Sequence, residues 1–333
     1  MKPRVTFGFV NCNRLFYLKS CVESLLYTTR DYKNREFIII DNASVEDGTD
    51  KYLDEKSKQG FKVIKQSKRD PANEFAKALN IIAREATGNF IVPLQGDMQF
   101  ILDCNWLDRY VDFYQKNIEN IGCILLDAQR EITNLNHRPY GVIQSQQKHN
   151  FLLDVKRNPV CGAADVMYSR QIIEKIYPWD EKNDKHEGGG DSETKMLQKV
   201  RQIMTNTSAR WFCAVPIVAP AVTIYTDIRG TNARVRGNRR YGDYWPSKKD
   251  FRYYQIHDDD SVSQLIEQFN GLPLSIEKLA APVGFAAPVD DDGAWLKNPI
   301  RPETASSSDY VILDEKDNIT IDEKKYVEQW LDS

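Results

Sequence analysis

The residues with the clearest chemical potential are Gln95, Gly96 and Asp97, which directly follow the apolar segment 90–94 (FIVPL). An apolar run of this length, bounded by turn formers, predicts a buried β-strand. The Asp97 carboxylate would then lie at the carboxyl end of the strand, where open α/β sheets bind ligands. Gly96 lets another group approach the backbone closely. A carboxylate placed there could bind a metal ion or a metal-bound phosphate, or it could simply end the strand in a turn.

The elements that must position Asp97 alternate between strands and helices over the first hundred residues. Strands are expected at residues 5–10, 36–40, 61–64 and 90–94, and helices at 15–27, 49–58 and 71–86, with Gly88 stopping the last helix. This alternation predicts an α/β fold with a central, mostly parallel sheet flanked by helices on both faces.

Polar clusters follow three of these strands, at residues 11–14, 41–44 and 95–97. The carboxyl ends of parallel strands lie on one edge of a sheet. We therefore expect the three clusters to line a single crevice, and their convergence is more informative than any one of them.

The rest of the chain has a weaker pattern. Helices are expected at 106–114 and 191–204, strands at 121–126 and 165–169, an extended stretch at 211–224, and one more helix at 322–331. A basic loop at 229–245 contains Arg229, Arg234, Arg236, Arg239, Arg240, Tyr241, Tyr244 and Trp245. Such a loop could bind phosphate groups or another anion, nucleic acid included, or it could be solvated.

Composition excludes several functions. The 333 residues have a net charge of -3, which argues against nucleic-acid binding. The six cysteines show no CxxC spacing and are expected to be reduced, and the four histidines show no HExxH pattern, so a zinc hydrolase is not expected. The sequence shows no signal-peptide core, and no segment approaches about 18 consecutive apolar residues. We expect a cytoplasmic protein without a transmembrane segment.

A series of motifs runs along residues 5–225: the strand and turn at 6–14, the helix with Leu18, Cys21 and 24–26, the segments 38–44 (IIIDNAS) and 47–49 (DGT), 78–80 (ALN), 86–88 (ATG), 95–97 (QGD), 106–107 (WL), 161–162 (CG), Arg170, 179–181 (WDE) and 188–193. In this order the motifs resemble those of family-2 glycosyltransferases with the GT-A fold. No single element is specific, but their shared order supports the family.

The resemblance implies a site for a nucleoside diphosphate sugar. Asp41 would accept hydrogen bonds from the base or ribose, or would cap the next turn instead. The other residues expected at the nucleotide are Val10, Asn11, Asn13, Arg14, Asn42, Ser44, Asn73, Lys77, Asn80, Gln95, Gly96 and Asp97. Arg14 could equally pair with a nearby carboxylate. The face of the helix with Asn73, Lys77 and Asn80 could equally be solvated.

The resemblance also implies a Mn²⁺ or Mg²⁺ ion at Asp97, the last acid of the Asp-x-Asp motif of the family. Gln95 replaces the first acid, so the site has one negative charge fewer and the metal could be less essential. Many relatives have a histidine as a second ligand near residues 216–227. This chain has none there, and Asp227 is the nearest acid.

Asp191 is the expected catalytic base. In the family, the second acid of a Glu-Asp pair deprotonates the acceptor hydroxyl. Here Gly190 replaces the glutamate, and Asp191 could also serve as a helix N-cap. The expected reaction is an inverting transfer of a sugar to a hydroxyl of a carbohydrate or glycoconjugate acceptor.

Three regions are expected: residues 1–100 for the donor, 101–250 for the acceptor, and an irregular extension with an acidic tail, 251–333, through which the chain could form oligomers. Two other functions remain open. The substitutions at Gln95 and Gly190 are compatible with a catalytically impaired protein that binds a glycan or a partner. A sugar-nucleotide nucleotidyltransferase is disfavoured, because residues 11–14 do not form the glycine-rich basic loop such enzymes need.

Overall fold

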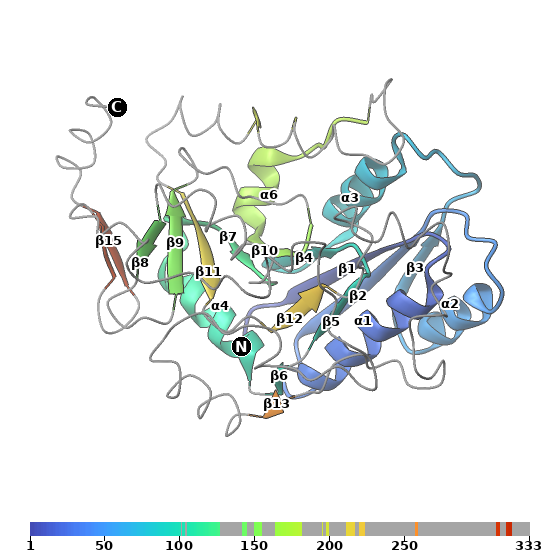
Figure 1. Cartoon of the computed structure of the whole chain (residues 1–333), viewed down its shortest axis with the longest axis horizontal. Helices are drawn as coiled ribbons and strands as arrows, with labels where there is room; N and C mark the ends of the chain where they lie inside the picture. The colour runs from blue at the N-terminus through green and yellow to red at the C-terminus, as the bar shows by residue number, and fades with distance from the viewer. Residues whose placement is uncertain are drawn as a thin grey trace, which may run out of the picture.

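The computed structural model of the chain describes residues 1–100, 102–103, 105–126, 142–144, 150–154, 164–181, 195, 198–199, 211–216, 220–223, 257–258, 311–313 and 318–321. Figure 1 shows the order of the elements in space. The predicted helices at 191–204 and 322–331 lie mostly or entirely outside these residues.

The first hundred residues form the expected alternation of strands and helices. Their elements are β1 (Val5–Asn11), α1 (Leu15–Thr28), β2 (Arg35–Asp41), α2 (Thr49–Lys58), β3 (Lys62–Lys65), α3 (Glu74–Glu85), β4 (Phe90–Leu94) and β5 (Met98–Phe100). The predicted strand at 90–94 and the predicted helix at 49–58 have the observed bounds.

The later elements are shorter. They are β6 (Leu102–Asp103), α4 (Trp106–Lys116), β7 (Ile121–Leu125), β8 (Val142–Gln144), β9 (Asn150–Asp154), β10 (Val166–Ser169), α6 (Arg170–Ile176), β11 (Phe212–Pro216), β12 (Ala221–Thr223), β13 (His257–Asp258), β14 (Val311–Leu313) and β15 (Ile319–Ile321). The extended stretch expected at 211–224 therefore contains two strands.

The central sheet has nine strands in the order β3-β2-β1-β4-β10-β7-β11-β9-β8. The strands β3, β2, β1 and β4 are parallel to one another, as predicted. Beyond β4 the sheet becomes mixed, because β10 runs antiparallel to both β4 and β7, while β7 and β11 are parallel. The predicted α/β fold is confirmed, with its parallel part confined mainly to the first hundred residues.

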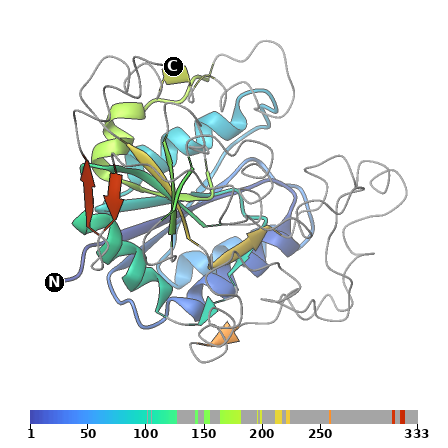
Figure 2. The same ribbon diagram turned by 60° about the vertical axis from the view of Figure 1, so that its left-hand side comes forward.

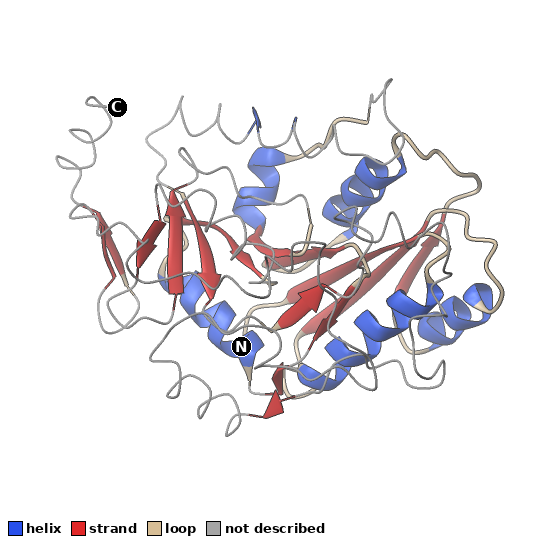
Figure 3. Cartoon of the chain, viewed as in Figure 1, coloured by secondary structure: helices blue, strands red, loops and turns tan. Residues whose placement is uncertain are grey.

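Helices cover both faces of this sheet, and each face has its own apolar core (Figures 2 and 3). One core contains Leu18 of α1, Leu53 of α2 and Val111 of α4. The other contains Leu79 of α3 and Ile172 of α6. Because β1 and β4 are buried between two layers, they read as mostly apolar runs rather than as alternating patterns.

Two expectations from composition can be compared with the described part of the chain. The cysteines there, Cys12, Cys21, Cys123 and Cys213, are free thiols, and the last three are buried. Among the residues that the structure describes, no helix combines the length and the apolar character required to cross a bilayer.

The ends of helix α3 differ from the prediction. The helix begins at Glu74 rather than at residue 71, because the Asp70 carbonyl accepts the Asn73 N–H and closes a turn first. It ends at Glu85, where Ala86 becomes extended. Gly88 is therefore not a helix stop; a Cβ there would lie 2.6 Å from Thr6 Oγ1 and 2.8 Å from the Arg4 carbonyl oxygen. Close packing against β1 explains this glycine.

Gly8 of β1 lets helix α3 approach the sheet. A Cβ at Gly8 would lie 2.4 Å from Ile82 Cγ2, deep inside the packed core. We predict that Gly8→Ala lowers the free energy of unfolding by about 1–3 kcal/mol through overpacking, as measured by urea denaturation. In an Ile82→Ala background the same change should cost less, because the clashing side chain is gone. Equal costs in both backgrounds would contradict this packing.

Candidate functional site

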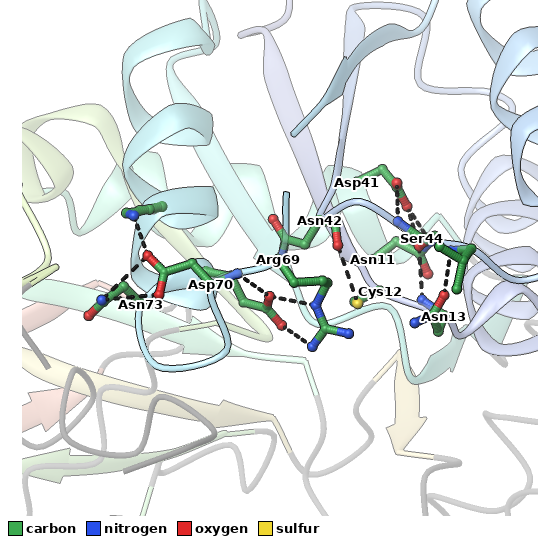
Figure 4. A network of polar contacts seen from close by, with 12 residues as sticks. Asn11, Cys12, Asn13, Asp41, Asn42, Ser44, Arg69, Asp70 and Asn73 are labelled. Atoms are coloured by element: carbon green, nitrogen blue, oxygen red, sulfur yellow. Dashed lines mark hydrogen bonds and ion pairs between the residues drawn. The ribbon is translucent and has the colours of Figure 1, made fainter. Parts of the chain in front are cut away.

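The site lies at the carboxyl ends of β1, β2 and β4. Figure 4 shows its polar residues that follow β1 and β2. In the parallel register Asn11 pairs with Asp41, and Phe9 pairs with Leu94, the last residue of β4. The Asn42 N–H donates to the Asn11 carbonyl at 2.9 Å and extends this alignment past the strands. The predicted convergence of the polar clusters on one sheet edge is therefore observed.

Asp41 is the centre of a hydrogen-bond network. Its Oδ1 accepts from Asn11 Nδ2 at 2.8 Å and from the Ser44 hydroxyl at 2.6 Å. Its Oδ2 accepts the Ser44 backbone N–H at 3.0 Å. Asp41 and Asn11 are 3% and 2% exposed. A carboxylate can accept about four hydrogen bonds, so these three contacts fix its orientation and leave capacity for a ligand donor.

Asn13 joins the loop after β1 to the loop after β2. Its Oδ1 accepts the backbone N–H groups of Val45 at 2.8 Å and Glu46 at 3.2 Å, and its own N–H donates to Ser44 Oγ at 2.9 Å. Asn13 and Ala43 have φ of 51° and 50°, in the left-handed region. Asn13 thus has the conformation that asparagine tolerates best among non-glycine residues, and it positions the loop rather than extending into solvent.

Ser44 ties this network together, since it contacts Asp41, Asn11 and the Asn13 backbone. We predict that Ser44→Ala weakens nucleotide binding about tenfold and costs about 1 kcal/mol of stability, because Asn11 and Asn13 each lose a partner. Calorimetric titration with UDP and GDP and urea denaturation measure the two effects. The matched control is Ser57→Ala, an exposed position on α2, which should change neither. Wild-type nucleotide affinity for Ser44→Ala would show that the network does not support the ligand.

The Gln95-Gly96-Asp97 turn lies against the end of β1. Gly96 has φ of 83°, and a Cβ on it would lie 3.0 Å from the Val10 carbonyl oxygen. The close backbone approach expected at this glycine is thus an approach by β1 itself. It brings the Asp97 carboxylate, which is fully buried, to 3.8 Å from Nη1 of Arg14. The Arg14 side chain is 33% exposed, whereas the Asp97 side chain is not exposed at all.

The donor chemistry at this corner fits a magnesium or manganese ion that is held largely by a diphosphate. Asp97 offers the hard oxygen that such ions prefer, and these ions commonly use one or two carboxylates together with phosphates and waters. In the described part of the chain, no group of three or more His, Cys, Asp or Glu side chains could hold a metal.

The three residues of the α3 region that were expected at the nucleotide have different surroundings. Asn73, at the N-cap, and Lys77 both contact the Asp70 carboxylate, and Lys77, the stronger influence, lowers the pKa of Asp70 below its usual range. Asn80 is buried. Its Nδ2 donates to the Trp179 carbonyl at 2.9 Å, and its Oδ1 accepts the Trp179 N–H at 2.8 Å. The structure thus places Asn80 at the joint with the 179–181 segment, and its contact with a nucleotide stays a prediction.

The loop after β3 adds a cation that the sequence analysis did not single out. Arg69 makes a two-pronged ion pair with Glu74, through Nε and Nη2, both at 2.8 Å (Figure 4). Its charge acts on Cys12, whose pKa burial nevertheless raises above the usual value. The Cys12 thiol therefore stays protonated at neutral pH and is a poor nucleophile. The strand-end rule, applied to β3 as well, would have pointed to Arg69.

Several predicted residues lie outside the described part of the chain. These are Asp191, Asp227 and the basic loop 229–245. The roles of Asp191 as a base and Asp227 as a metal ligand stay predictions.

The sequence matches the profile of glycosyl transferase family 2 over residues 8–177, about half of the chain. The matched span begins inside β1 and contains β2 to β4 and all three strand-end clusters. The chain therefore belongs to glycosyl transferase family 2, and the resemblance drawn from its motifs is confirmed.

Three solved structures illustrate the likeness. Residues 1–349 of S. aureus TarS share 15% identity, over 66% of this chain and 60% of that one, with a TM-score of 0.46. The mannosyltransferase PcManGT from Pyrobaculum calidifontis, in complex with GDP-Man and Mn²⁺, shares 17% identity over 59% and 52%, with a TM-score of 0.42. GalNAc-T7 with UDP, GalNAc and Mn²⁺ shares 15% identity over 67% and 43%, with a TM-score of 0.48.

This chain thus spans less than two thirds of the length of each of these structures. Comparison with curated proteins finds no significant match.

Proposed function

We propose that the protein is an inverting glycosyltransferase that moves a sugar from a nucleoside diphosphate sugar to an acceptor hydroxyl. The observation that carries this proposal is the placement of Asp41 and Asp97 on one sheet edge, at the ends of β2 and just beyond β4, in a chain of glycosyl transferase family 2. One carboxylate can serve the nucleoside and the other the diphosphate.

The nucleoside would bind at Asp41. Its carboxylate is held by Asn11 and Ser44 and needs no reorientation to accept a hydrogen bond from a base N–H or a ribose hydroxyl. A preorganised acceptor binds more tightly than a mobile one, because less side-chain freedom is lost. Asn13 contributes indirectly, since it fixes the loop that carries Ser44.

The diphosphate would bind at the corner formed by Arg14 and Asp97. A divalent ion at Asp97 would supply positive charge that stabilises the departing diphosphate. Arg14 is already next to Asp97 and partly exposed, and its guanidinium suits phosphate oxygens. Gln95 brings no negative charge to hold the metal ion. Arg14 would therefore neutralise a larger share of the diphosphate charge than in relatives with two acids.

Asp191 would be the general base. The acceptor oxygen attacks the anomeric carbon from the face opposite the diphosphate, the carbon–oxygen bond to the diphosphate breaks, and the hydroxyl proton passes to the Asp191 carboxylate. This single displacement inverts the anomeric configuration. Glu193, two residues further on, could contact the acceptor.

The acceptor would be a carbohydrate or glycoconjugate bound by residues 101–250, with the basic loop 229–245 near the diphosphate or an anionic acceptor. A cytoplasmic location and self-association through residues 251–333 are further predictions, best checked by fractionation and by light scattering of the purified chain.

Binding of the donor is the direct test. Thermal-shift measurements with UDP-, GDP- and dTDP-sugars, with and without Mn²⁺, should give a stabilisation by one donor class that Mn²⁺ increases, because a ligand that binds the folded state raises its stability. The same screen on Asp41→Ala should show a much smaller shift. No stabilisation by any donor, with or without Mn²⁺, would overturn the proposal.

A further inference from the structure

We infer that Asp165 is a positioning residue that fixes the Gln95-Gly96-Asp97 turn, and with it the diphosphate corner of the site. This inference rests on the proposed function for the meaning of that corner. Asp165 immediately precedes β10, the strand at which the parallel part of the sheet becomes mixed.

Asp165 holds the end of β4 by two contacts. Its Oδ1 accepts the backbone N–H of Gln95 at 3.0 Å, and its own N–H donates to the Pro93 carbonyl at 2.7 Å. The two contacts bracket Leu94, the last residue of β4. The position of Gln95 is therefore set by the Asp165 side chain at the point where the turn toward Asp97 begins.

The same residue connects this strand end to the other half of the sheet. Its carbonyl accepts the Leu126 N–H at 3.2 Å, and the Leu126 carbonyl in turn accepts the Ala221 N–H at 3.1 Å. Ala221 begins β12, which pairs with β5 directly after Asp97. The turn is thus supported on both sides by one chain of hydrogen bonds that passes through Asp165.

Two properties suit Asp165 to this task. Its φ is 62°, in the left-handed region, which aspartate and asparagine tolerate better than most residues. It is also only 5% exposed, so water has little access to its hydrogen bond with the Gln95 N–H.

The test compares Asp165→Asn with Asp165→Gly. Both substitutions tolerate the left-handed backbone, but only asparagine keeps an oxygen that can accept the Gln95 N–H. We expect Asp165→Asn to bind UDP or GDP with Mn²⁺ within about threefold of wild type, and Asp165→Gly to bind at least about tenfold more weakly, the cost of one strong hydrogen bond. Hydrogen exchange of the peptide that contains residues 95–97 should accelerate in Asp165→Gly and stay as in wild type in Asp165→Asn.

Each outcome separates this inference from the proposed function. If wild type binds nucleotide and Asp165→Gly binds equally well, or if exchange at 95–97 is unchanged, the positioning role is wrong and the proposed function stands. If Asp165→Asn is as impaired as Asp165→Gly, the negative charge acts directly and positioning is again wrong. If exchange responds as expected but wild type binds neither nucleotide with Mn²⁺, the turn is positioned as described and the proposed function fails.

Discussion

Replacing Asp191 by asparagine should reduce sugar transfer about 10²–10⁴-fold, because the acceptor hydroxyl would lose its general base. Asparagine has nearly the same shape as aspartate but cannot take a proton at neutral pH. Donor affinity should stay as in wild type, since the base acts on the acceptor. Turnover measured by release of nucleoside diphosphate, together with calorimetric donor binding, checks both parts.

The matched control for this variant is Asp184→Asn, an acid seven residues earlier to which we assign no role. It should transfer sugar at the wild-type rate. If Asp191→Asn retains a rate close to wild type, another group removes the proton, and Glu193 would be examined first. A loss of donor binding together with transfer would instead indicate a structural role for Asp191.

Asp97→Asn should abolish the enhancement of nucleotide binding by Mn²⁺, with a loss of at least about 100-fold in metal-dependent affinity, because even residues that only support metal ligands cost 10–100-fold when replaced. The same substitution should leave the melting temperature of the ligand-free protein unchanged or raised. Asp97 is fully buried, and a neutral amide avoids the cost of burying a charge. Calorimetric titration with UDP and GDP, with and without Mn²⁺, and thermal denaturation provide the two measurements.

Opposite effects on binding and stability would exclude unfolding as the cause of lost binding. Asp103→Asn is a useful control, because Asp103 lies on β6 and pairs with Arg30 away from the strand ends. It should bind nucleotide and Mn²⁺ as wild type does. Unchanged Mn²⁺ dependence in Asp97→Asn would mean that Asp97 does not bind the metal, and Arg14 would then be the main source of positive charge at the diphosphate.

The sequence predicted the fold of the first hundred residues well because the signals there are local. The apolar run at 90–94 is bounded by turn formers, and the periodic helix at 49–58 follows a glycine with φ of 82°. The rule that parallel strands end on one edge then brought Asn11, Asp41 and Asp97 together. Each of these inferences needs only short-range pattern and one topological rule.

The contacts that the sequence did not predict depend on partners far along the chain. Asn80 looks like part of a polar helix stripe, yet its amide is buried against Trp179, 99 residues later. Nothing in the four-residue strand β10 indicates that it runs antiparallel to β4, and so nothing pointed to Asp165 as the partner of Gln95. Local pattern identifies which residues are polar, but not which of them meet across a sheet.

The measurement that tests the account most directly is donor turnover followed by NMR of the released sugar. The protein would be incubated with Mn²⁺ and the α-linked donor that gives the largest thermal shift. No acceptor would be added, so that water takes its place and the donor is hydrolysed. We predict slow release of nucleoside diphosphate and early accumulation of the β anomer, which inversion requires, with neither product formed by Asp191→Asn. Early accumulation of the α anomer, or no release from any donor that binds, would contradict an inverting glycosyltransferase.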